Sequence, residues 1–411
     1  MNLRINQITK CRICTDTQLN EILDLGLSEI SSYFPKSDEA DPPRAPLVLV
    51  QCGNCGLVQL QHNVDQDFLF GNTYGYRTGL TPTMQSHVES LARWLSEAYR
   101  IVPGSKVLDI GSNDGTFLNI LADQELELYG VDPNYDDMAH YYRDNILGKK
   151  AFFDANLFVG LKFDLITSIA MFYDINDPVN FALQIKSVLS KNGIWFLEQS
   201  YLMDMLENNS FDTICHEHLM YYSLDSLSRV MSSAELKIIG IRRSMANGGS
   251  LGIVVSHVDS NFETDEMVES LLSMERNTQH NLISNFKAEV LLLRSKIEEM
   301  ILQIRSEGKT IWGVGASTKG NTILNFLGLN SLTIGAIADK NLLKLGRVTP
   351  GTRIPIVEAE DLRNARPDYA IVLPWHFRNF IIEDEKEYLN LGGKLIFPLP
   401  NLDIVSNGET D

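Results

Sequence analysis

The segment Lys106-Val-Leu-Asp-Ile-Gly-Ser-Asn-Asp-Gly-Thr-Phe-Leu118 contains a strand, a glycine turn and the start of a helix. An apolar run typical of a buried strand occupies residues 107–110, glycines follow at positions 111 and 115, and a helical pattern begins at Thr116. This order of elements places backbone N–H groups and a helix N-terminus at the carboxyl edge of a parallel sheet. The segment therefore predicts a Rossmann-like α/β domain with a ligand site at this turn.

The residues of the turn favour a sulfonium cofactor over a dinucleotide. The spacing Asp109-x-Gly111-x-x-x-Gly115 differs from G-x-G-x-x-G, and Asp109 and Asp114 would repel a diphosphate but suit a cation. A second predicted strand, residues 126–131, ends in Asp132, an acceptor for a ribose hydroxyl pair. The turn resembles motif I of S-adenosylmethionine (SAM) dependent methyltransferases, of the E/D-x-G-x-N-D-G subtype. An ordinary Rossmann-like core turn is the alternative.

Downstream, strand and helix patterns continue to alternate. We predict strands at 151–153, 163–171 and 193–198, a helix at 178–190, and an antiparallel hairpin of 236–243 and 251–257 across Asn247-Gly-Gly249. Five parallel strands followed by a hairpin make the class I methyltransferase sheet, whose ligands lie beyond the strand carboxyl ends. The predicted cofactor-binding residues are Asp109, Gly111, Ser112, Asn113, Gly115, Asp132, Pro133 and Ser168.

Composition and charge limit the function classes. The 411 residues allow two or three domains, and a formal net charge of −18 argues against nucleic-acid partners and anionic membrane surfaces. The sequence has no apolar run long enough to span a bilayer and no signal-peptide pattern. We therefore expect a cytoplasmic protein, and the absence of an obvious coiled-coil seam favours a monomer.

Four of the five cysteines form two C-x-x-C pairs, Cys11/Cys14 and Cys52/Cys55. Two such knuckles supply four thiolates for a tetrahedral Zn²⁺, whereas disulfides are the alternative in an oxidising compartment. Four protein ligands leave no open position, so this zinc is predicted to be structural. We predict a loop over residues 35–46 between the knuckles and a strand at 57–61 after them.

A dense set of titratable groups lies between the fifth strand and the hairpin, in Cys215-His216-Glu217-His218-Leu-Met-Tyr221-Tyr222. Such density is typical of sites where protons move. Metal ligation and satisfied core polar groups are the alternatives. The aromatic loop Tyr74-Gly-Tyr76 either lines the mouth of the cofactor pocket or is a packed linker.

The C-terminal third begins with a long helical pattern at 264–307, which we interpret as a bridge between domains and, alternatively, as a coiled coil. Residues 310–321 then repeat the strand, glycine turn and helix order, with a second strand leading into Asp339. This predicts a second Rossmann-like unit, although Thr318 stands where a dinucleotide fingerprint has its third glycine.

Together, several motifs resemble the three-domain sugar C-methyltransferases, a family that includes the 3-C-methyltransferase of D-tetronitrose biosynthesis. The resemblance runs from Cys11 to about Pro400. The motifs are both C-x-x-C knuckles, D-I-G-S-N-D-G at 109–115, F-D-T-I-C-H-E-H-L-x-Y-Y-S-L at 211–224, N-G-G-S at 247–250, and G-A-S-T-K-G-N at 315–321. The implied domains are a zinc-binding module (1–70), a SAM-binding methyltransferase domain (71–262), and a linker helix with a Rossmann-like substrate-binding domain (263–411).

The resemblance implies a nucleotide-diphosphate 4-keto-6-deoxysugar as substrate, methylated at C3 through an enolate; C5 stays open. It assigns His218 as general base, with Glu217 orienting it or binding the sugar, and the roles of Glu217 and His216 are exchangeable. The implied catalytic residues are His218, Glu217, Tyr76 and Tyr222, and the implied substrate-binding residues are His216, Lys319, Asn321 and His376.

The chain departs from the family pattern at two places. Cys215 stands where the family has a tyrosine, and Asp174 or Tyr173 stands where it has a second histidine. These departures suggest a different sugar or a changed proton route. Competing functions are methylation of oxygen or nitrogen in another small acceptor, an NAD(P)-dependent oxidoreductase using the C-terminal turn, and a zinc adaptor without catalysis.

Overall fold

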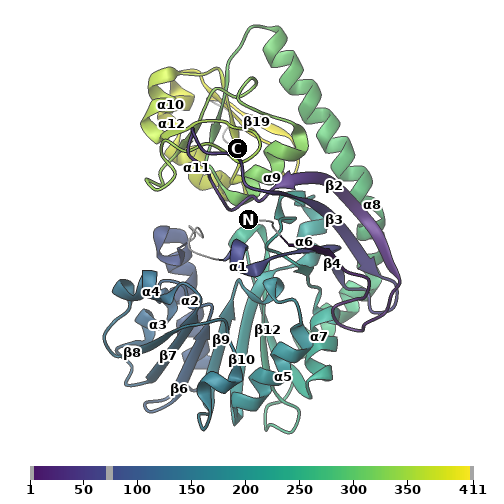
Figure 1. Cartoon of the computed structure of the whole chain (residues 1–411), viewed down its shortest axis with the longest axis vertical. Helices are drawn as coiled ribbons and strands as arrows, with labels where there is room; N and C mark the ends of the chain where they lie inside the picture. Colours follow the sequence, from purple (N-terminus) through teal and green to yellow (C-terminus); the bar gives the residue numbers. More distant parts are fainter. Residues whose placement is uncertain (1–3, 71–76, 408–411) are drawn as a thin grey trace.

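The computed structural model describes residues 4–70 and 77–407. Two α/β lobes lie one above the other in Figure 1, and the long helix α8 (Glu266–Ser306) runs along one side of both. Strands of the N-terminal module lie beside α8 at the level where the lobes meet. No helix in the described part of the chain is both long and apolar enough to cross a bilayer.

The lower lobe is built on a seven-stranded sheet of order β12-β13-β10-β9-β6-β7-β8. Five neighbouring strands are parallel, whereas β13 runs antiparallel to β10, and β12 runs antiparallel to β13. The prediction of five parallel strands and a hairpin is confirmed. The strands are β6 (Lys106–Ile110), β7 (Glu127–Asp132), β8 (Ile146–Lys150), β9 (Phe163–Ile169), β10 (Leu189–Ser200), β12 (Leu236–Ser244) and β13 (Ser250–His257).

The third strand was predicted wrongly at residues 151–153. The strand is β8, residues 146–150, at the sheet edge, and only Ile146 in it is buried. An edge strand with one covered face needs no apolar run, so the hydrophobic pattern missed it. The phenylalanines that suggested a strand, Phe152 and Phe153, instead line a cavity.

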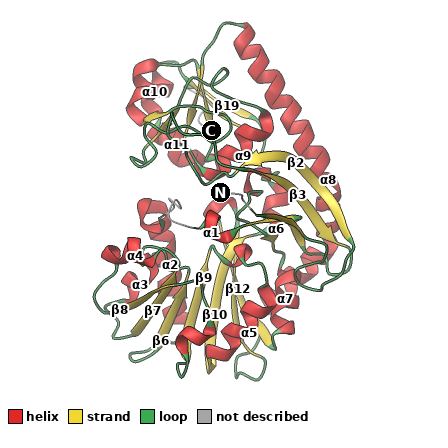
Figure 2. Ribbon diagram, viewed as in Figure 1, coloured by secondary structure: helices red, strands yellow, loops and turns green. Residues whose placement is uncertain are grey.

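Helices cover both faces of this sheet (Figure 2). Val107 packs in the core under α2 (Pro82–Ala98) and α3 (Thr116–Leu121), and its neighbour Leu108 packs in the core under α5 (Pro178–Val188) and α7 (Leu224–Ser233). This alternation follows from the two-residue period of a strand. The helices are capped locally: Thr81 accepts a hydrogen bond from the N–H of Met84 at the start of α2.

The N-terminal module contains a four-stranded sheet of order β11-β4-β3-β2, in which every pair is antiparallel. Its outermost strand β11 (Met220–Tyr221) comes from the histidine-rich segment of the lower lobe. The other strands are β2 (Leu19–Glu29), β3 (Arg44–Cys52) and β4 (Val58–Leu60), and a separate pair joins β1 (Ile5–Gln7) to β5 (His62–Val64).

The predicted loop over residues 35–46 extends too far, because β3 begins at Arg44 and includes Pro46. Pro46 is a paired residue opposite Leu27, next to a register shift between Asp24 and Leu27. Irregular pairing of this kind tolerates a proline within a strand. The sequence pattern alone had placed Pro46 in a loop. The strand expected at 57–61 is β4.

The upper lobe is a second α/β unit with strand order β16-β15-β14-β17-β18-β19. It confirms the predicted strand, glycine turn and helix at residues 310–321. Its strands are β14 (Ile311–Val314), β15 (Ile337–Asp339), β16 (Ile356–Glu358), β17 (Tyr369–Val372), β18 (Lys394–Phe397) and β19 (Asp403–Val405), and its helices are α9 (Thr318–Leu327), α10 (Ala359–Ala365), α11 (Arg378–Asp384) and α12 (Lys386–Asn390).

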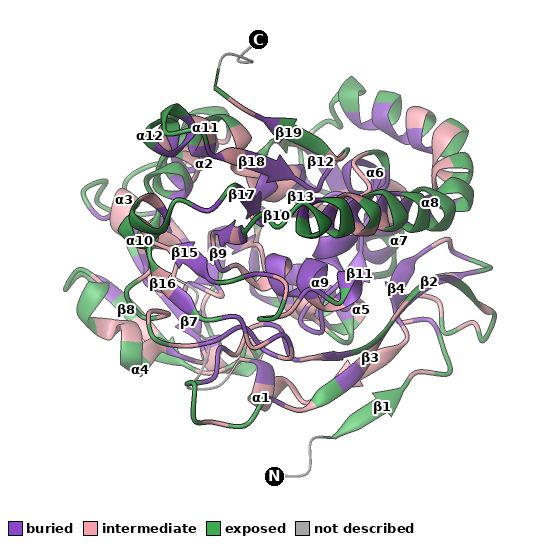
Figure 3. Ribbon diagram, turned by 90° about the horizontal axis from the view of Figure 1, so that it is seen from above, coloured by how far each residue is buried: buried purple, intermediate pink, exposed green. Residues whose placement is uncertain are grey.

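Helix α8 bridges the lobes, as predicted. Its first turns pack Val268 and Leu272 into the core of the lower lobe, whereas Ile297, Ile301 and Ile304 pack into the core of the upper lobe. Figure 3 shows the strands of both sheets buried and much of α8 exposed. The upper core also contains strands of the zinc module, so that module and the upper lobe share one apolar interior.

Candidate active site

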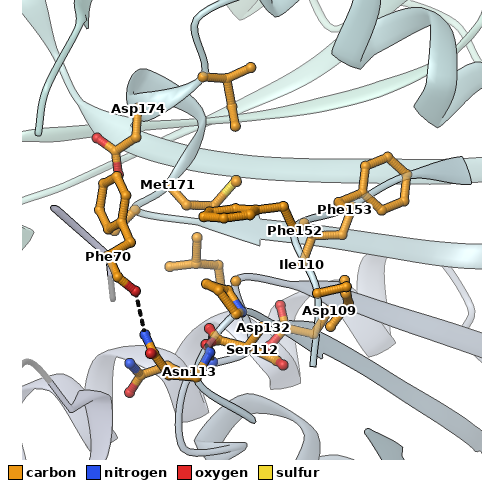
Figure 4. A pocket seen from close by; sticks show the side chains of 18 of the residues that line it. Phe70, Asp109, Ile110, Ser112, Asn113, Asp132, Phe152, Phe153, Met171 and Asp174 are labelled. Atoms are coloured by element: carbon orange, nitrogen blue, oxygen red, sulfur yellow. Dashed lines mark hydrogen bonds between the residues drawn. The ribbon is translucent and has the colours of Figure 1, made fainter. Parts of the chain in front are cut away.

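A cavity of about 350 Å³ lies at the carboxyl ends of β6, β7 and β9. Figure 4 shows Asp109, Asp132 and Ser112 on one side of it, with Met171 and Phe152 opposite. Six of the eight predicted cofactor-binding residues line this cavity: Asp109, Gly111, Ser112, Asn113, Asp132 and Pro133. The position is the one that the strand order requires, where the connections from β6 and β9 leave the sheet in opposite directions.

The two acids of the cavity are held differently. Asp132 accepts hydrogen bonds from the backbone N–H groups of Asn113 at 2.9 Å and Asn134 at 2.7 Å. Asp109 accepts one from the hydroxyl of Thr167 at 2.6 Å, and burial, with a smaller contribution from the charge of Asp132, raises its pKa to about 7. A buried cation beside Asp109 would restore its ionised form, so the site fits a sulfonium and an amino group.

Glycine is required at position 111. Its φ is +71°, and a Cβ there would lie 3.1 Å from Cγ of Met171, a residue that lines the cavity. The residue therefore keeps open a passage that any side chain would narrow. This cradle and the paired acids fit SAM.

Gly115 and Ser168 do not line the cavity. Gly115 is the N-cap of α3 with φ +70°, and it lies against the ring of Tyr142, whose hydroxyl donates to Ser112 at 2.8 Å. Ser168 is fully buried and accepts a hydrogen bond from the indole of Trp195 at 3.1 Å. Gly115 therefore supports the turn from outside the cavity, whereas Ser168 lies in the core of the sheet.

The expectation that Asp114 faces the cofactor is not met. Asp114 accepts hydrogen bonds from the N–H of Gly79 at 2.9 Å and from the hydroxyl of Thr116 at 2.6 Å, and Arg77 lies 3.5 Å away. Its carboxylate therefore ties the glycine turn to the segment before α2. An aspartate two residues before a helix forms such local bonds readily, which sequence reasoning did not consider.

Cavity residues missed by sequence reasoning follow β9: Met171, Ile175, Asn176 and Asp177. The rule that ligands lie beyond strand carboxyl ends could have found them.

The histidine-rich segment (residues 211–223) lies between the zinc module and the residues that follow β9 (171–177). Met220 and Tyr221 pair with β4, and the N–H of Leu219 donates to the carbonyl of Tyr173 at 3.0 Å. The rings of Tyr173 and His218 lie 4.2 Å apart between centroids. The structure thus brings the segment that carries His218 next to the segment that forms one wall of the cavity.

Several buried polar atoms in and beside this segment have no hydrogen-bond partner. Glu217 is 5% exposed, and neither of its carboxylate oxygens has a hydrogen-bond partner; the same holds for Oδ1 of Asp174. Burial, followed by the charge of Glu217, raises the pKa of Asp174 well above its usual range. Unpartnered buried polar atoms are costly, so they indicate a binding site rather than satisfied core residues.

His218 is held by one ring nitrogen. Its Nδ1 lies 3.0 Å from the carbonyl oxygen of Thr213. Burial, followed by the positive charge of Lys319, lowers its pKa to about 4. His216 faces the zinc module instead, with Nε2 3.1 Å from the carbonyl of Ala45 and Nδ1 unpartnered.

Tyr222, one of the two predicted catalytic tyrosines, is not among the residues that line the cavity. Tyr222 is 1% exposed, stacks on Phe172, and donates its hydroxyl to the sulfur of Met220 at 3.1 Å, so it lies in the core of the lower lobe. Tyr76 lies outside the described residues. Tyr221 is also buried and donates to the carbonyl of Thr213 at 3.4 Å.

The upper lobe contributes cationic and aromatic groups to the same region. Lys319, in the first turn of α9, donates to the carbonyl of Asn247 at 2.7 Å, and its charge also helps to lower the pKa of His376 to about 3, an effect due mainly to burial. Asp212 accepts a hydrogen bond from the indole of Trp375 at 2.8 Å. These contacts join the N-G-G turn and the histidine-rich segment of the lower lobe to the upper one.

Asn321, like His216, is a predicted substrate-binding residue that contacts the zinc module. It is fully buried and donates from Nδ2 to the carbonyl of Ser31 at 2.7 Å, although its Oδ1 has no partner. Its contact joins α9 to the zinc module.

The four cysteines of the knuckles form a compact set whose ligand atoms all lie within 4.8 Å of one another. The Sγ atoms of Cys11 and Cys55 are 3.5 Å apart, as are those of Cys14 and Cys52. Tetrahedral zinc with Zn–S bonds of about 2.3 Å requires sulfurs about 3.8 Å apart, so the set fits. It is the metal-competent cluster in the described chain; the histidine-rich segment forms none.

The sheet order, the glycine cradle and the cysteine cluster define a SAM-dependent methyltransferase with a structural zinc site. Three family models match consecutive parts of the chain: a putative zinc binding domain at 11–70, a methyltransferase domain at 84–240, and a C-methyltransferase C-terminal domain at 245–400. Together these models span residues 11–400, so the chain matches a three-domain C-methyltransferase family along most of its length.

Individual relatives and solved structures are similar to the chain over different lengths. The chain is 28% identical to the C-methyltransferase NovU of Streptomyces niveus over 419 residues, which cover 99% of each chain. It is 31% identical over 113 residues to a tRNA U34 carboxymethyltransferase of Campylobacter lari, which covers 26% of this chain and 39% of the relative. Among solved structures, a SAM-dependent methyltransferase of Clostridium acetobutylicum matches 42% of this chain and 92% of its own, at 15% identity and a TM-score of 0.35.

Proposed function

We propose that this enzyme transfers a methyl group from SAM to C3 of a nucleotide-diphosphate 4-keto-6-deoxysugar, through an enolate that His218 generates as general base. The full-length similarity to a C-methyltransferase supports a carbon acceptor. Carbon becomes nucleophilic only after a C–H proton is removed, so the site needs a base and a group that accepts enolate charge.

The geometry of His218 carries the proposal. A carbonyl oxygen only accepts, so the contact with Thr213 places the proton on Nδ1 and leaves the lone pair of Nε2 free. A pKa of about 4 keeps the ring neutral at physiological pH. The ring contacts Tyr173, which lies in the chain between Met171 and Asp174, two residues that line the cofactor cavity.

Binding of a diphosphate would strengthen this base. The charge of Lys319 contributes to the low pKa of His218, and a diphosphate near Lys319 would offset that charge. The pKa of His218 would then rise toward the working pH, where proton abstraction is most efficient. Lys319 lies in the first turn of α9, which favours anions at this position.

The reaction has two steps, formation of the enolate and its methylation. His218 takes the C3 proton on Nε2, and the C–H electron pair becomes the enolate that the 4-keto group stabilises. SAM, when bound, supplies the methyl group for the new C–C bond. Holding both partners in one cleft supplies much of the acceleration.

The test uses purified protein with a dTDP-4-keto-6-deoxyhexose. With SAM, we expect the sugar nucleotide to gain the mass of one methyl group. Without SAM, we expect deuterium from solvent to enter C3, and His218→Asn to abolish this exchange; the exposed His280→Asn is the matched control. Full methyl transfer by His218→Asn contradicts the assignment of the base.

The same assay separates the competing functions. Methyl transfer without solvent exchange indicates an oxygen or nitrogen acceptor, and exchange at C5 moves the methylated position. Calorimetric titration with S-adenosylhomocysteine and with NADH tests the oxidoreductase alternative, which requires tight binding of NADH.

A further inference from the structure

Asp174 lies where the cofactor cavity meets the histidine-rich segment. It ends the 3-10 turn Phe172–Asp174, its N–H donates to the carbonyl of Met171 at 3.1 Å, and its carbonyl accepts from Gln66 at 2.9 Å. Its side chain lines the cavity, beside Phe70 in Figure 4. The backbone of Asp174 is therefore held by hydrogen bonds, and its carboxyl group lies at the cavity.

The Asp174 carboxyl group has an unused oxygen. Oδ1 is buried and has no hydrogen-bond partner among the described residues. Glu217, 5% exposed with both oxygens unpartnered, is the charge that acts on it most strongly. A charge on Asp174 would meet both the burial of Oδ1 and repulsion from Glu217, so the neutral form of Asp174 is favoured.

Other groups around this pair do not reverse the effect. Cys215 and Tyr221 from the same segment feel the charges of both Glu217 and Asp174, and burial raises the pKa of each well above its usual range, so they stay neutral. The positive charge of Lys319 lowers the pKa of His218, whereas it does not contribute to the raised pKa of Asp174. The pair thus favours one proton on Asp174.

We propose that Asp174 is a neutral carboxylic acid that donates its O–H to the carbonyl oxygen of the acceptor while His218 removes the adjacent C–H proton. This role rests on the proposed function. Glu217 is then a positioning residue, whose negative charge keeps the proton on Asp174 without contact with the reacting atoms.

The step balances as an enolisation. The C–H bond breaks and its proton goes to Nε2 of His218, while the C–H electron pair forms the C=C bond. The carbonyl oxygen gains the displaced electron pair and takes the proton of Asp174. When the carbon forms its bond to the methyl group, the S–CH3 bond of the sulfonium breaks and its electron pair stays on the sulfur of the departing thioether. The carbonyl then re-forms, its proton returns to Asp174, and His218 releases the C–H proton to solvent.

Two substitutions separate a neutral donor from an anion. Asp174→Ala removes the donor, and we expect solvent exchange at the sugar carbon to fall roughly 100-fold. Asp174→Asn keeps a neutral N–H donor, and we expect it to recover about tenfold over the alanine variant. Asp136→Asn, at an exposed aspartate paired with Lys150, is the matched control for an Asp-to-Asn substitution away from the cavity. An asparagine variant as slow as alanine, or an alanine variant at the wild-type rate, overturns the role.

A second measurement needs no sugar and no turnover. Infrared difference spectra of wild type minus Asp174→Asn at neutral pH should contain the C=O stretch of a protonated carboxyl group. Because burial also raises the pKa of Asp109 to about 7, the same band must persist in Asp109→Asn. Absence of the band shows an ionised Asp174 and overturns the proposal, whatever the substrate.

Failure of the inference and failure of the proposed function are distinguishable. A wild type that exchanges and methylates the ketosugar alongside an equally active Asp174→Ala contradicts only the role of Asp174. A wild type that does neither with any nucleotide ketosugar contradicts the proposed function and the role of Asp174 with it.

Discussion

The two lobes use the same local design at their glycine turns, and only one of them leaves room for a ligand. In the lower lobe, Asp132 accepts hydrogen bonds from the N–H groups of Asn113 in the turn and Asn134 two residues on. In the upper lobe, Asp339 accepts from Ala316 at 2.6 Å and Asn341 at 2.6 Å in the same pattern. Both acids end the second strand of their unit.

The space above the two turns differs. Gly111 borders the cavity, whereas a Cβ on Gly315 would meet the ring of Pro374 at 2.5 Å. Lys344 also fills the upper turn, since its Nζ donates to the carbonyl of Ala316 at 2.5 Å. A glycine in a turn therefore indicates that other atoms approach the backbone closely. In the upper lobe those atoms belong to the protein itself, in Pro374 and Lys344.

Zinc removal should have the largest effect, and it tests which turn depends on the zinc module. The module contacts the upper lobe through Asn321 and Ser31 and the histidine-rich segment through β11. Since structural zinc contributes on the order of 10 kcal/mol, a chelator should abolish hydrogen-exchange protection in β2–β4 and residues 211–223. Protection of β6 and binding of S-adenosylhomocysteine should persist. Protection that survives zinc loss, or is not restored by added Zn²⁺, contradicts this.

The second-largest expected effect is the loss of stability caused by burying the Asp109 carboxyl group beside the open turn. Burial raises the pKa of Asp109 from 3.8 to about 7, so this residue costs no stability below pH 3.8, its cost grows as pH rises from 3.8 to about 7, and the cost is constant at higher pH. Asp109→Asn should therefore increase the free energy of unfolding of the unliganded protein by about 4 kcal/mol above pH 7. Thr167 can still donate to the amide oxygen.

Urea unfolding at several pH values measures this difference, which should vanish near pH 4. The same variant should bind S-adenosylhomocysteine more weakly. A stability gain that is independent of pH would mean that the gain does not come from the buried carboxylate.

A paired substitution compares the turns directly. Asp132→Ala should weaken binding of S-adenosylhomocysteine by roughly 100-fold, because the acceptor for the ribose and the support of the Asn113 N–H are both lost. Asp339→Ala should leave that affinity unchanged and lower the melting temperature of the upper lobe. Calorimetry measures the affinity and thermal unfolding measures the stability. An equal effect of both variants on affinity would contradict the claim that only the lower turn binds the cofactor.

The smallest expected effect is at the filled turn. Gly315 has φ +80° and lies against Pro374, so Gly315→Ala should lower the free energy of unfolding by about 2 kcal/mol without changing affinity for S-adenosylhomocysteine. Gly328→Ala, at φ +64° with open space around it, isolates the backbone strain from the clash. Equal losses in both variants would mean that Pro374 adds nothing.

The sequence by itself determined the elements whose signals are local: the glycine turns, the cysteine knuckles, the hairpin and helix α8. It also identified six of the residues that line the cavity, because strand ends and turns place backbone atoms by short-range geometry. It failed at β8, where an edge strand carries no apolar run, and at Asp114, whose carboxylate bonds to Gly79 across the fold.

Only the tertiary structure decided which turn is open, that β11 joins the histidine-rich segment to the zinc module, and that the charge of Glu217 acts on Asp174. These outcomes depend on contacts between residues far apart in the chain. Burial and charge coupling are properties of the packed molecule, so no local pattern contains them.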